Sequence, residues 1–404
     1  MTETDRGSLP PRTVSLVLCQ PDGEVLGALP PFQVDLPWWQ EVADVVEGAF
    51  AHHGVEVTVL RLLEAEPRPF SAGGAVTYLA ELAGDVPGDL DDWSGHLGLD
   101  EPRRASWARP GGPAADLAWA DAALASLGRV RSAPAQQVRT WNLSSLWRLL
   151  TTEGACWLKV VPPFFAHEGA VLAHLDPTTV PPLLAAQGPR ILVGEVPGPD
   201  RYGASGPVLV EMVEQLVALQ GQWIGREDEL IALGAPDWRA GPLTRLLTAL
   251  VDRADPSLEP GVAAGLEALV VGLAERFAAV AACGLPDTLV HGDFHRGNLR
   301  GPDGSLTLLD WGDCGAGQPM LDQAAFLEGL EPEDAPAVRA AWSAAWRRLV
   351  PGCDPDRAAG LLAPVSALRQ ALIYDTFLTG IEPAERIYHA DDPARWLARA
   401  AQLA

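Results

Sequence analysis

Polar residues suited to chemistry are concentrated in residues 289–313, which read LVHGDFHRGNLRGPDGSLTLLDWGD. An apolar strand runs into a loop that holds two histidines, an aspartate, an arginine and an asparagine. A hairpin then leads into a second strand, SLTLLD, which ends at Asp310. The fold must therefore bring a polar loop and the end of a second strand close together.

The side chains in this segment suit the transfer of a phosphoryl group. That reaction needs little covalent help from the protein. It needs a carboxylate beside the acceptor hydroxyl and oxygen ligands for Mg²⁺. Asp293, Asn298 and Asp310 provide these groups. A polar hairpin with buried, satisfied His and Asp side chains is the structural alternative.

The motif HGDFHRGN resembles the catalytic loop HGDxHxxN of the aminoglycoside phosphotransferase and choline kinase family, and DWG resembles the DFG metal site of protein kinases. The resemblance implies that Asp293 is the catalytic base and that Asn298 and Asp310 bind Mg²⁺. It assigns the support of the catalytic loop to three further residues, His291, His295 and Asp322. It covers about residues 130–400.

Lys159 is the only lysine in the chain. It lies in the apolar strand WLKVV, where an unpaired charge would be costly to bury. In the family, a lysine on the third strand of the small lobe binds the phosphates of ATP and pairs with a helix glutamate, which would be Glu168 here. The segment RILVGEVPG resembles the family's hinge between the two lobes, so the backbone of Glu195 and Val196 would face adenine.

Protein kinases cover the phosphates with a glycine-rich loop, and WNLSSLW stands at that place in this chain. We expect Ser144, together with Asn142, Ser145 or the nearby backbone, to cover the phosphates. Further acidic and aromatic residues of the C-terminal part could line an acceptor site, although each alone fits a solvated or packing residue better. They are Glu328, Glu331, Trp342, Tyr374, Asp375 and Glu382.

Hydrophobic periodicity predicts strands in the first half of the chain and helices in the second. The predicted strands are 13–19, 21–27, 55–63, 75–82, 136–143, 145–152, 155–161 and 190–196, with helices at 37–53, 115–127 and 165–175. The later helices are predicted near 207–222, 242–253, 261–283, 319–329, 334–349, 357–379 and 392–403.

We therefore predict an α+β chain with the bilobal protein-kinase-like fold and a small N-terminal α/β domain. The small lobe would be an antiparallel β-sheet and the large lobe mainly helical. The predicted parts are an accessory domain at 1–86, a connector at 87–127, the small lobe at 128–196 and the helical lobe with the catalytic loop at 197–404.

The N-terminal pattern of strand, DGEVL turn, helix ending in HHG and strand VEVTVLRLL resembles a Nudix skeleton. Gly48, Ala51 and His52 stand where that family has metal-binding glutamates. The resemblance therefore implies a domain without pyrophosphohydrolase activity. An unrelated small α/β domain is the alternative.

A formal net charge of −24 argues against broad nucleic-acid binding, which needs a cationic face. The charge could attract a cationic substrate, or it could be ordinary surface charge.

The five cysteines form no CxxC pair, which is typical of reduced thiols in a cytoplasmic protein. The N-terminus has no apolar leader, and no apolar run approaches ~18 residues, so we expect neither secretion nor a membrane span.

The motifs and the family that they resemble predict an ATP- and Mg²⁺-dependent phosphotransferase. Its acceptor would be a hydroxyl of a small molecule of the aminoglycoside, amino sugar or amino alcohol type, with cationic compounds among the candidates. A protein kinase is disfavoured because the chain has no glycine-rich loop and no APE-like segment. The alternative from another class is a nucleotide-binding pseudokinase or regulatory partner protein. Loss of the Lys, the Asp, the Asn or the metal Asp would indicate it, and all four are present.

Overall fold

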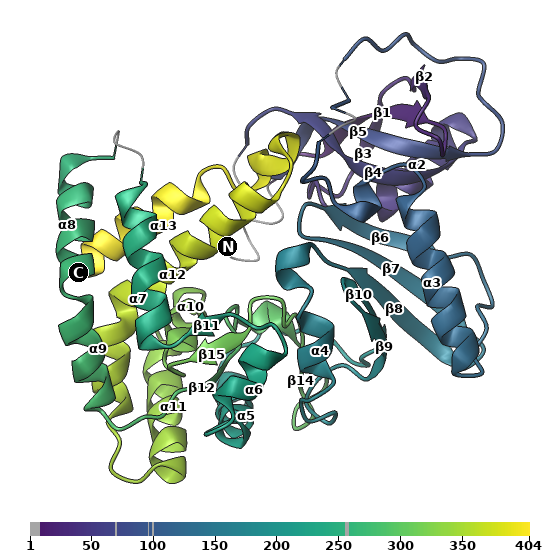
Figure 1. The fold of residues 1–404 in the computed structure, drawn as a ribbon. Helices are drawn as coiled ribbons and strands as arrows, with labels where there is room; N and C mark the ends of the chain where they lie inside the picture. Colours follow the sequence, from purple (N-terminus) through teal and green to yellow (C-terminus); the bar gives the residue numbers. More distant parts are fainter. Residues whose placement is uncertain (1–8, 69–70, 96, 99–100, 255–257) are drawn as a thin grey trace. The chain divides into compact units, whose positions relative to one another are not determined.

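The computed structural model describes residues 9–68, 71–95, 97–98, 101–254 and 258–404. The chain forms two compact units. The first consists of Met1–Phe164, Leu184–Glu195 and Phe377–Ala390, and the second of Phe165–Leu183, Val196–Thr376 and Asp391–Ala404. Strands dominate the first unit and helices the second, so the predicted α+β class is confirmed (Figure 1).

The N-terminal part of the first unit is a five-stranded sheet backed by one helix. Strand β1 lies between β2 and β5, β5 continues to β4, and the short β3 also pairs with β1. The β1–β5 pair is parallel. Helix α2 ends at Gly54, which has a φ of 68°. The elements are β1 (Arg12–Cys19), β2 (Val25–Ala28), β3 (Phe32–Val34), α2 (Ala43–His53), β4 (Glu56–Ala65) and β5 (Gly74–Ala83).

The second sheet of this unit has the strand order β6-β7-β8-β10-β9. Alternate residues of its strands, such as Trp147, Leu158 and Leu192, form a buried core with Ala120 and Leu124 of helix α3. Helix α3 lies beside this sheet (Figure 1). The sheet elements are β6 (Gln136–Trp141), β7 (Ser144–Thr151), β8 (Gly154–Val160), β9 (Leu183–Gln187) and β10 (Arg190–Gly194), and α3 spans Gly112–Ser126. Three of these strands match the predicted strands 136–143, 145–152 and 155–161 closely.

Side-chain hydrogen bonds join the two sheets of the first unit. The Gln137 amide accepts from the Val59 N–H at 2.9 Å and donates to the Val59 carbonyl at 2.7 Å. The Thr140 hydroxyl donates to the Leu60 carbonyl at 3.3 Å. The N-terminal sheet and the second sheet are therefore parts of one packed unit, and the predicted boundaries at residues 86 and 127 stay predictions.

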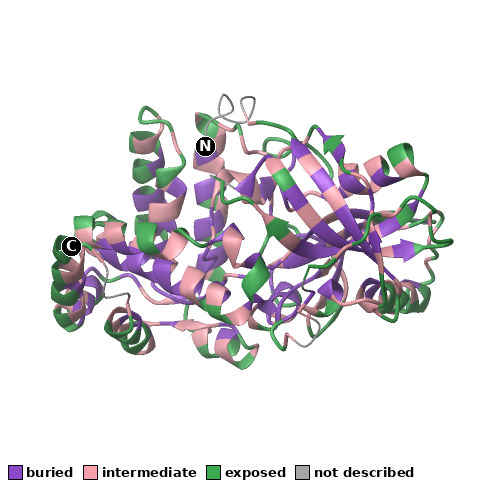
Figure 2. Ribbon diagram, turned by 90° about the horizontal axis from the view of Figure 1, so that it is seen from above, coloured by how far each residue is buried: buried purple, intermediate pink, exposed green. Residues whose placement is uncertain are grey.

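The second unit is built mainly from helices. The predicted helix at 261–283 is two helices, because the chain breaks at Gly272. Its helices are α4 (Glu168–Leu172), α5 (Pro207–Gln222), α6 (Glu227–Ala232), α7 (Ala240–Asp252), α8 (Pro260–Val271), α9 (Leu273–Ala281), α10 (Leu321–Glu328), α11 (Ala335–Leu349), α12 (Pro355–Gly380, whose last turn lies in the first unit) and α13 (Asp392–Leu403). Buried residues follow the inner side of these helices and exposed residues the outer side (Figure 2).

Short strands in the second unit hold the polar segment found in the sequence. Strand β12 (Thr288–Val290) pairs with β15 (Gly315–Gly317), which also pairs with β11 (Asp237–Trp238). Strands β13 (Leu299–Arg300) and β14 (Thr307–Leu308) form a hairpin. The segment therefore leaves β12, turns through a loop and returns along this hairpin.

All five cysteines are buried free thiols, which agrees with the expected reduced state. In the part of the chain that the structure describes, no helix combines the length and the apolar character of a membrane span.

Candidate active site

The turn after β12 is held by a carboxylate from the first turn of α10. Buried Asp322 accepts from the N–H of His291 at 2.9 Å and from the N–H of Gly292 at 2.8 Å. Its Oδ2 also accepts from Gln220 at 3.0 Å. Gly292 has a φ of 88°, and a Cβ there would overlap the Asp313 carbonyl, so the turn requires glycine. Asp322 thus fixes the start of the loop by the kind of contact that the resemblance implied.

His291 connects the loop with the strand that returns to Asp310. Its ring is fully buried, and burial lowers its pKa against the charge of Asp322. Nδ1 accepts from the Asp293 N–H at 3.3 Å, so the proton of the neutral ring lies on Nε2, which donates to the Leu309 carbonyl at 3.0 Å. The ring also lies 4.6 Å from the Trp311 ring.

Asp293 is an ionised carboxylate with 41% of its side chain exposed. Burial would raise its pKa, but hydrogen bonding and positive charge from His295 and a hydrogen bond from Asn298 outweigh it and lower the pKa. Asn298 Nδ2 donates to Asp293 Oδ2 at 3.1 Å, and His295 Nε2 lies 3.5 Å from the same atom. His295 Nδ1 accepts from the Gly297 N–H, so its Nε2 carries the proton. The exposed carboxylate can accept a proton from a bound hydroxyl.

Asn298 and Asp310 bring two oxygen ligands to the other side of the loop. Asn298 Nδ2 also donates to the Asp293 carbonyl at 2.9 Å, which leaves Oδ1 as the cation-binding atom of this amide. The Leu309 N–H donates to the Asn298 carbonyl at 2.7 Å, so Asp310 follows directly after a residue bonded to Asn298. Asp310 adopts a left-handed φ of 62°, a conformation that costs energy in a non-glycine residue and is common at functional sites.

This donor set fits Mg²⁺ in the manner that phosphoryl-transfer proteins use. Mg²⁺ is usually held by one or two protein oxygens, with phosphate oxygens and waters completing its six ligands. Asn298 and Asp310 supply two such oxygen ligands. Among the described residues no group of three or more His, Cys, Asp or Glu could hold a metal.

Glu168, at the start of α4, contacts the chain just after Asp310. Its buried Oε1 accepts from the Trp311 N–H at 3.2 Å. Glu168 thereby fixes the backbone that carries the Asp310 carboxylate. Lys159 belongs to the first unit and Glu168 to the second, so their predicted pairing stays a prediction.

Lys159 lies on strand β8 between two neighbouring strands. Its partners in the sheet are Leu146 of β7 and Ile191 of β10. Leu158 and Val160, which alternate with it, point into the core that α3 covers. The lysine therefore projects from the face of the sheet opposite α3.

The predicted hinge residues are partly engaged within their own units. The Glu195 N–H donates to the Ala155 carbonyl at 3.2 Å, and its carboxylate pairs with Arg148 at 3.0 Å. The Val196 carbonyl accepts from Arg300 at 2.9 Å. The Glu195 carbonyl and the Val196 N–H are the remaining backbone groups of the two residues that adenine could use.

The β6–β7 hairpin corrects part of the phosphate-cover prediction. Asn142 is buried, and its amide donates to the Glu385 carbonyl at 3.0 Å. Ser145 is also buried and accepts from Trp147 at 3.0 Å. Both side chains therefore serve packing. Ser144 is buried as well and accepts from the Trp141 indole at 3.1 Å, which leaves its own hydroxyl proton to donate.

Two of the residues suggested for an acceptor site are structural. Trp342 is fully buried, with its ring edge-on to the rings of Phe294 and Phe326. Glu382 lies in the first unit, buried in ion pairs with Arg61 and Arg104. The others lie on the helical unit or its loops: Glu328, Glu331, Tyr374 and Asp375, the last paired with Arg253 at 2.6 Å.

Arg369 of α12 supports the backbone of the site, and it was not predicted from the sequence. The buried guanidinium donates to the Gly292 carbonyl and to the Asp313 carbonyl, each at 3.3 Å. It also lies over the Trp238 ring at 4.7 Å. A single charge within the apolar stretch VSALRQALIY was the sequence feature that could have identified it.

A family model described as "Phosphotransferase enzyme family" matches residues 135–361, which is more than half of the chain. The comparison with curated proteins gives no significant match. Residues 1–134 lie outside the family match, so the Nudix-like resemblance of the N-terminal part stays a prediction.

Several solved structures resemble the chain. A macrolide 2′-phosphotransferase from Brachybacterium faecium is 17% identical, with a TM-score of 0.49 over 69% of this chain and 97% of that one. A choline/ethanolamine kinase family protein from Mesorhizobium loti is 15% identical, with a TM-score of 0.46 over 71% and 98%. Aminoglycoside 2′-phosphotransferase-IIIa, in its GDP complex, is 14% identical, with a TM-score of 0.47 over 69% and 98%. At such identities their substrates do not transfer to this chain.

Proposed function

The chain belongs to the phosphotransferase enzyme family, and we propose that it transfers the γ-phosphoryl group of ATP to a hydroxyl of a small molecule with the help of Mg²⁺. The observation that carries this proposal is the state of Asp293. Its carboxylate is partly exposed, and His295 and Asn298 keep it ionised. An inactive nucleotide-binding protein would not need such a group.

In the proposed reaction the acceptor hydroxyl binds beside Asp293. The carboxylate accepts its proton as the oxygen attacks the γ-phosphorus in line. A carboxylate with a lowered pKa is a weak base, so its main contribution is to orient the hydroxyl, and the proton moves late. Asn298 and His295 keep the carboxylate in place through bonds to the same oxygen.

We propose that Asn298 Oδ1 and the Asp310 carboxylate hold Mg²⁺. When bound, the ion would neutralise the charge of the phosphates. His291, Asp322 and Glu168 fix the backbone around these ligands. Lys159 offers a compact positive charge for the phosphates, and Ser144 offers a hydroxyl donor.

The remaining assignments are proposals of the same kind. The Glu195 carbonyl and the Val196 N–H would bind adenine. The acceptor would be a hydroxyl compound of the aminoglycoside, amino sugar or amino alcohol type, which the strongly negative chain would attract if it is cationic. The buried free thiols support a cytoplasmic location, and residues 1–86 would form an accessory domain.

The test is a screen of the purified full-length protein with Mg-ATP and a panel of aminoglycosides, hexosamines and amino alcohols. ADP release is measured together with the mass of the phosphorylated product. Asp293→Asn should lose about 10²-fold or more of the transfer rate while it still binds Mg-ATP. Binding of Mg-ATP without turnover of any acceptor would favour the pseudokinase alternative, and unchanged turnover in Asp293→Asn would refute the assignment of the base.

A further inference from the structure

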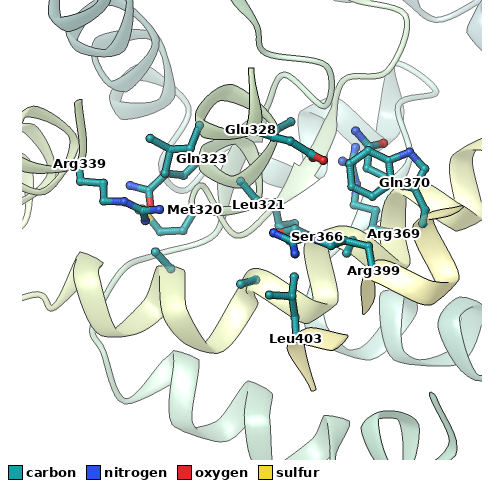
Figure 3. A pocket seen from close by; sticks show the side chains of 17 residues that line it. Met320, Leu321, Gln323, Glu328, Arg339, Ser366, Arg369, Gln370, Arg399 and Leu403 are labelled. Atoms are coloured by element: carbon teal, nitrogen blue, oxygen red, sulfur yellow. The ribbon is translucent and has the colours of Figure 1, made fainter. Parts of the chain in front are cut away.

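The helical unit contains a cavity of about 260 Å³ that the proposed reaction does not use. Helices α10, α11, α12 and α13 line it (Figure 3). Asp293, Asn298 and Asp310 do not belong to its walls. Small alanines of α10 and α12 leave the space open, and Met320, Leu321 and Leu403 give it apolar surface.

The charged side chains around this cavity are mostly positive. Arg339, Arg369 and Arg399 line it, and Glu328 is the one carboxylate among the residues around it. This excess stands out because the chain has 53 acidic residues and only 29 basic ones. A local concentration of guanidinium groups in such a chain suits a negatively charged ligand.

Other arginines of the same helices form ion pairs with carboxylates. Arg347 and Arg348 of α11 pair with Asp356 and Glu214, and Arg395 of α13 pairs with Asp392. Within residues 258–404 and the other described parts, no carboxylate pairs with Arg339 or Arg399. These two guanidinium groups therefore keep their hydrogen-bonding capacity for a ligand.

Buried polar atoms without partners also line the cavity. Ser366 is 6% exposed and Arg369 2% exposed. Ser366 Oγ, Arg369 Nε and Trp396 Nε1 have no hydrogen-bond partner among the described residues. Leaving a buried donor unsatisfied costs about 1–3 kcal/mol, so such atoms call for an explanation. All three can donate a hydrogen bond to an acceptor in the cavity.

We infer that this cavity binds a small molecule that carries a carboxylate or phosphate group and an apolar part. The anionic group would accept hydrogen bonds from Arg339, Arg399 and the buried donors, because guanidinium groups match carboxylate and phosphate geometry. The apolar part would lie against Met320 and Leu403. Arg369 also donates to the Gly292 carbonyl, so one side chain contacts both the cavity and the catalytic loop.

The first experiment measures binding directly on the full-length protein. The probes are inorganic phosphate, phosphate monoesters and short-chain carboxylates, with sodium chloride at equal ionic strength as the reference. Melting temperature and calorimetric affinity are recorded for the wild type, for Arg339→Ala/Arg399→Ala and for Arg347→Ala/Arg348→Ala. The last variant loses the same charge, and neither of its two residues lines the cavity.

At least one probe should bind the wild type and the Arg347→Ala/Arg348→Ala control equally. Its affinity should fall at least about tenfold in Arg339→Ala/Arg399→Ala, since each lost charged hydrogen bond is worth about 1.5–3 kcal/mol. Absence of binding by every probe at millimolar concentration would overturn the inference. An affinity unchanged by Arg339→Ala/Arg399→Ala would do the same.

A second measurement distinguishes an effector from an acceptor. If the bound compound changes the turnover of another acceptor and is recovered unaltered, it is an effector that binds in the cavity. If it appears in the phosphorylated product, it binds beside Asp293 rather than in the cavity, and the inference is overturned. The Asp293→Asn variant separates this site from the proposed reaction, because it should still bind the anion with wild-type affinity after phosphoryl transfer is lost.

Discussion

At the scale of single residues, the hydrogen bond that each histidine of the catalytic loop accepts at one ring nitrogen fixes the proton on the other ring nitrogen. His291 and His295 both accept a backbone N–H at Nδ1, so both present the Nε2 proton. His291 is buried and stays neutral, because burial lowers its pKa. His295 is raised in pKa by its hydrogen bond and charge interaction with Asp293, against the effect of burial. One histidine thus supports the backbone, and the other supports the charge of the base.

Replacing His295 by Gln should move the acid limb of kcat/KM to higher pH. The pKa of Asp293 is depressed, so the wild type should keep its ionised base far into the acid range. Without the His295 charge the pKa should rise by about one pH unit or more. The pH profile of the variant is compared with that of His174→Gln, an exposed histidine. Identical profiles for His295→Gln and the wild type would show that His295 does not tune the base.

Lys159→Arg keeps the positive charge and should still lower kcat/KM for ATP by about tenfold or more, because a planar guanidinium replaces a compact ammonium. Arg190→Lys is the matched control. Arg190 lies on β10 of the same sheet and pairs with Asp116 of α3 at 2.7 Å. Steady-state kinetics with varied ATP should show a loss only for Lys159→Arg. Wild-type kinetics in that variant would exclude a role of Lys159 at the phosphates.

Site residues could be predicted where the chemistry is local in the sequence. Asp293, His295 and Asn298 lie within six positions, so their mutual contacts follow from one short loop. Arg369 contacts the same loop from 77 positions away, and no local pattern indicates which backbone carbonyls it meets. The packing role of Asn142 could not be predicted for the same reason, because its partner, Glu385, is 243 positions distant.

At the scale of elements, helix α10 holds the catalytic loop through one carboxylate. Asp322→Asn keeps the size of the side chain but turns one acceptor into a donor that faces a backbone N–H. The variant should unfold with a free energy about 1–3 kcal/mol lower, and its kcat should fall at least about tenfold because the turn at Gly292 loosens. Urea unfolding and steady-state kinetics measure both effects.

Asp334→Asn is the control for this prediction. Asp334 is the N-cap residue of α11 and its side chain accepts from the Gly206 N–H at 3.2 Å, so it too is an aspartate at the start of a helix in the same unit. It has no contact with the catalytic loop in the hydrogen bonds of the described chain. Equal losses of kcat in the two variants would mean that the effect of Asp322→Asn is not specific to the loop.

Helices and strands with clear periodicity could be predicted almost to the residue, as α5 and α13 show. The errors occur where tertiary contacts decide. The predicted helix at 37–53 begins only at Ala43, because Trp38 and Glu41 pair with Ala72 and Arg139 in β-bridges. Strand β9 was not predicted, because its sequence LLAAQ shows no alternation of apolar and polar residues. It forms by pairing with its neighbour β10.

At the scale of the whole chain, a buried polar cluster joins the N-terminal sheet to a segment more than 300 positions later. Glu382 pairs with Arg61 at 3.4 Å and with Arg104 at 2.8 Å. Glu385, in the short 3₁₀ helix Pro383–Tyr388, accepts from the Leu62 N–H at 3.2 Å. All of these residues belong to the first unit, so the C-terminal segment is part of the core of that unit.

Glu382→Gln should strongly destabilise the first unit. The substitution removes the carboxylate that pairs directly with Arg61 and Arg104, and both are less than 8% exposed. Breaking a buried pair by removing one partner costs about 3–5 kcal/mol. Chemical denaturation at neutral pH measures the loss. A change below about 1 kcal/mol would mean that water reaches the cluster and screens it.

Glu385→Gln should have the opposite effect, and only at the higher pH values. Burial, assisted by the charge of Glu382, raises the pKa of Glu385 from 4.5 to about 8. The folded state therefore binds a proton that the unfolded state releases above its own lower pKa, so the stability present below pH 4.5 is lost as the pH rises toward 8. The Gln variant carries no such proton and still offers an oxygen to the Leu62 N–H. At pH 8 it should be more stable than the wild type by on the order of a few kcal/mol, and the difference should shrink toward pH 5. Denaturation at both pH values decides the matter, since a variant that is less stable at pH 8 would show that the buried carboxylate is ionised and paired.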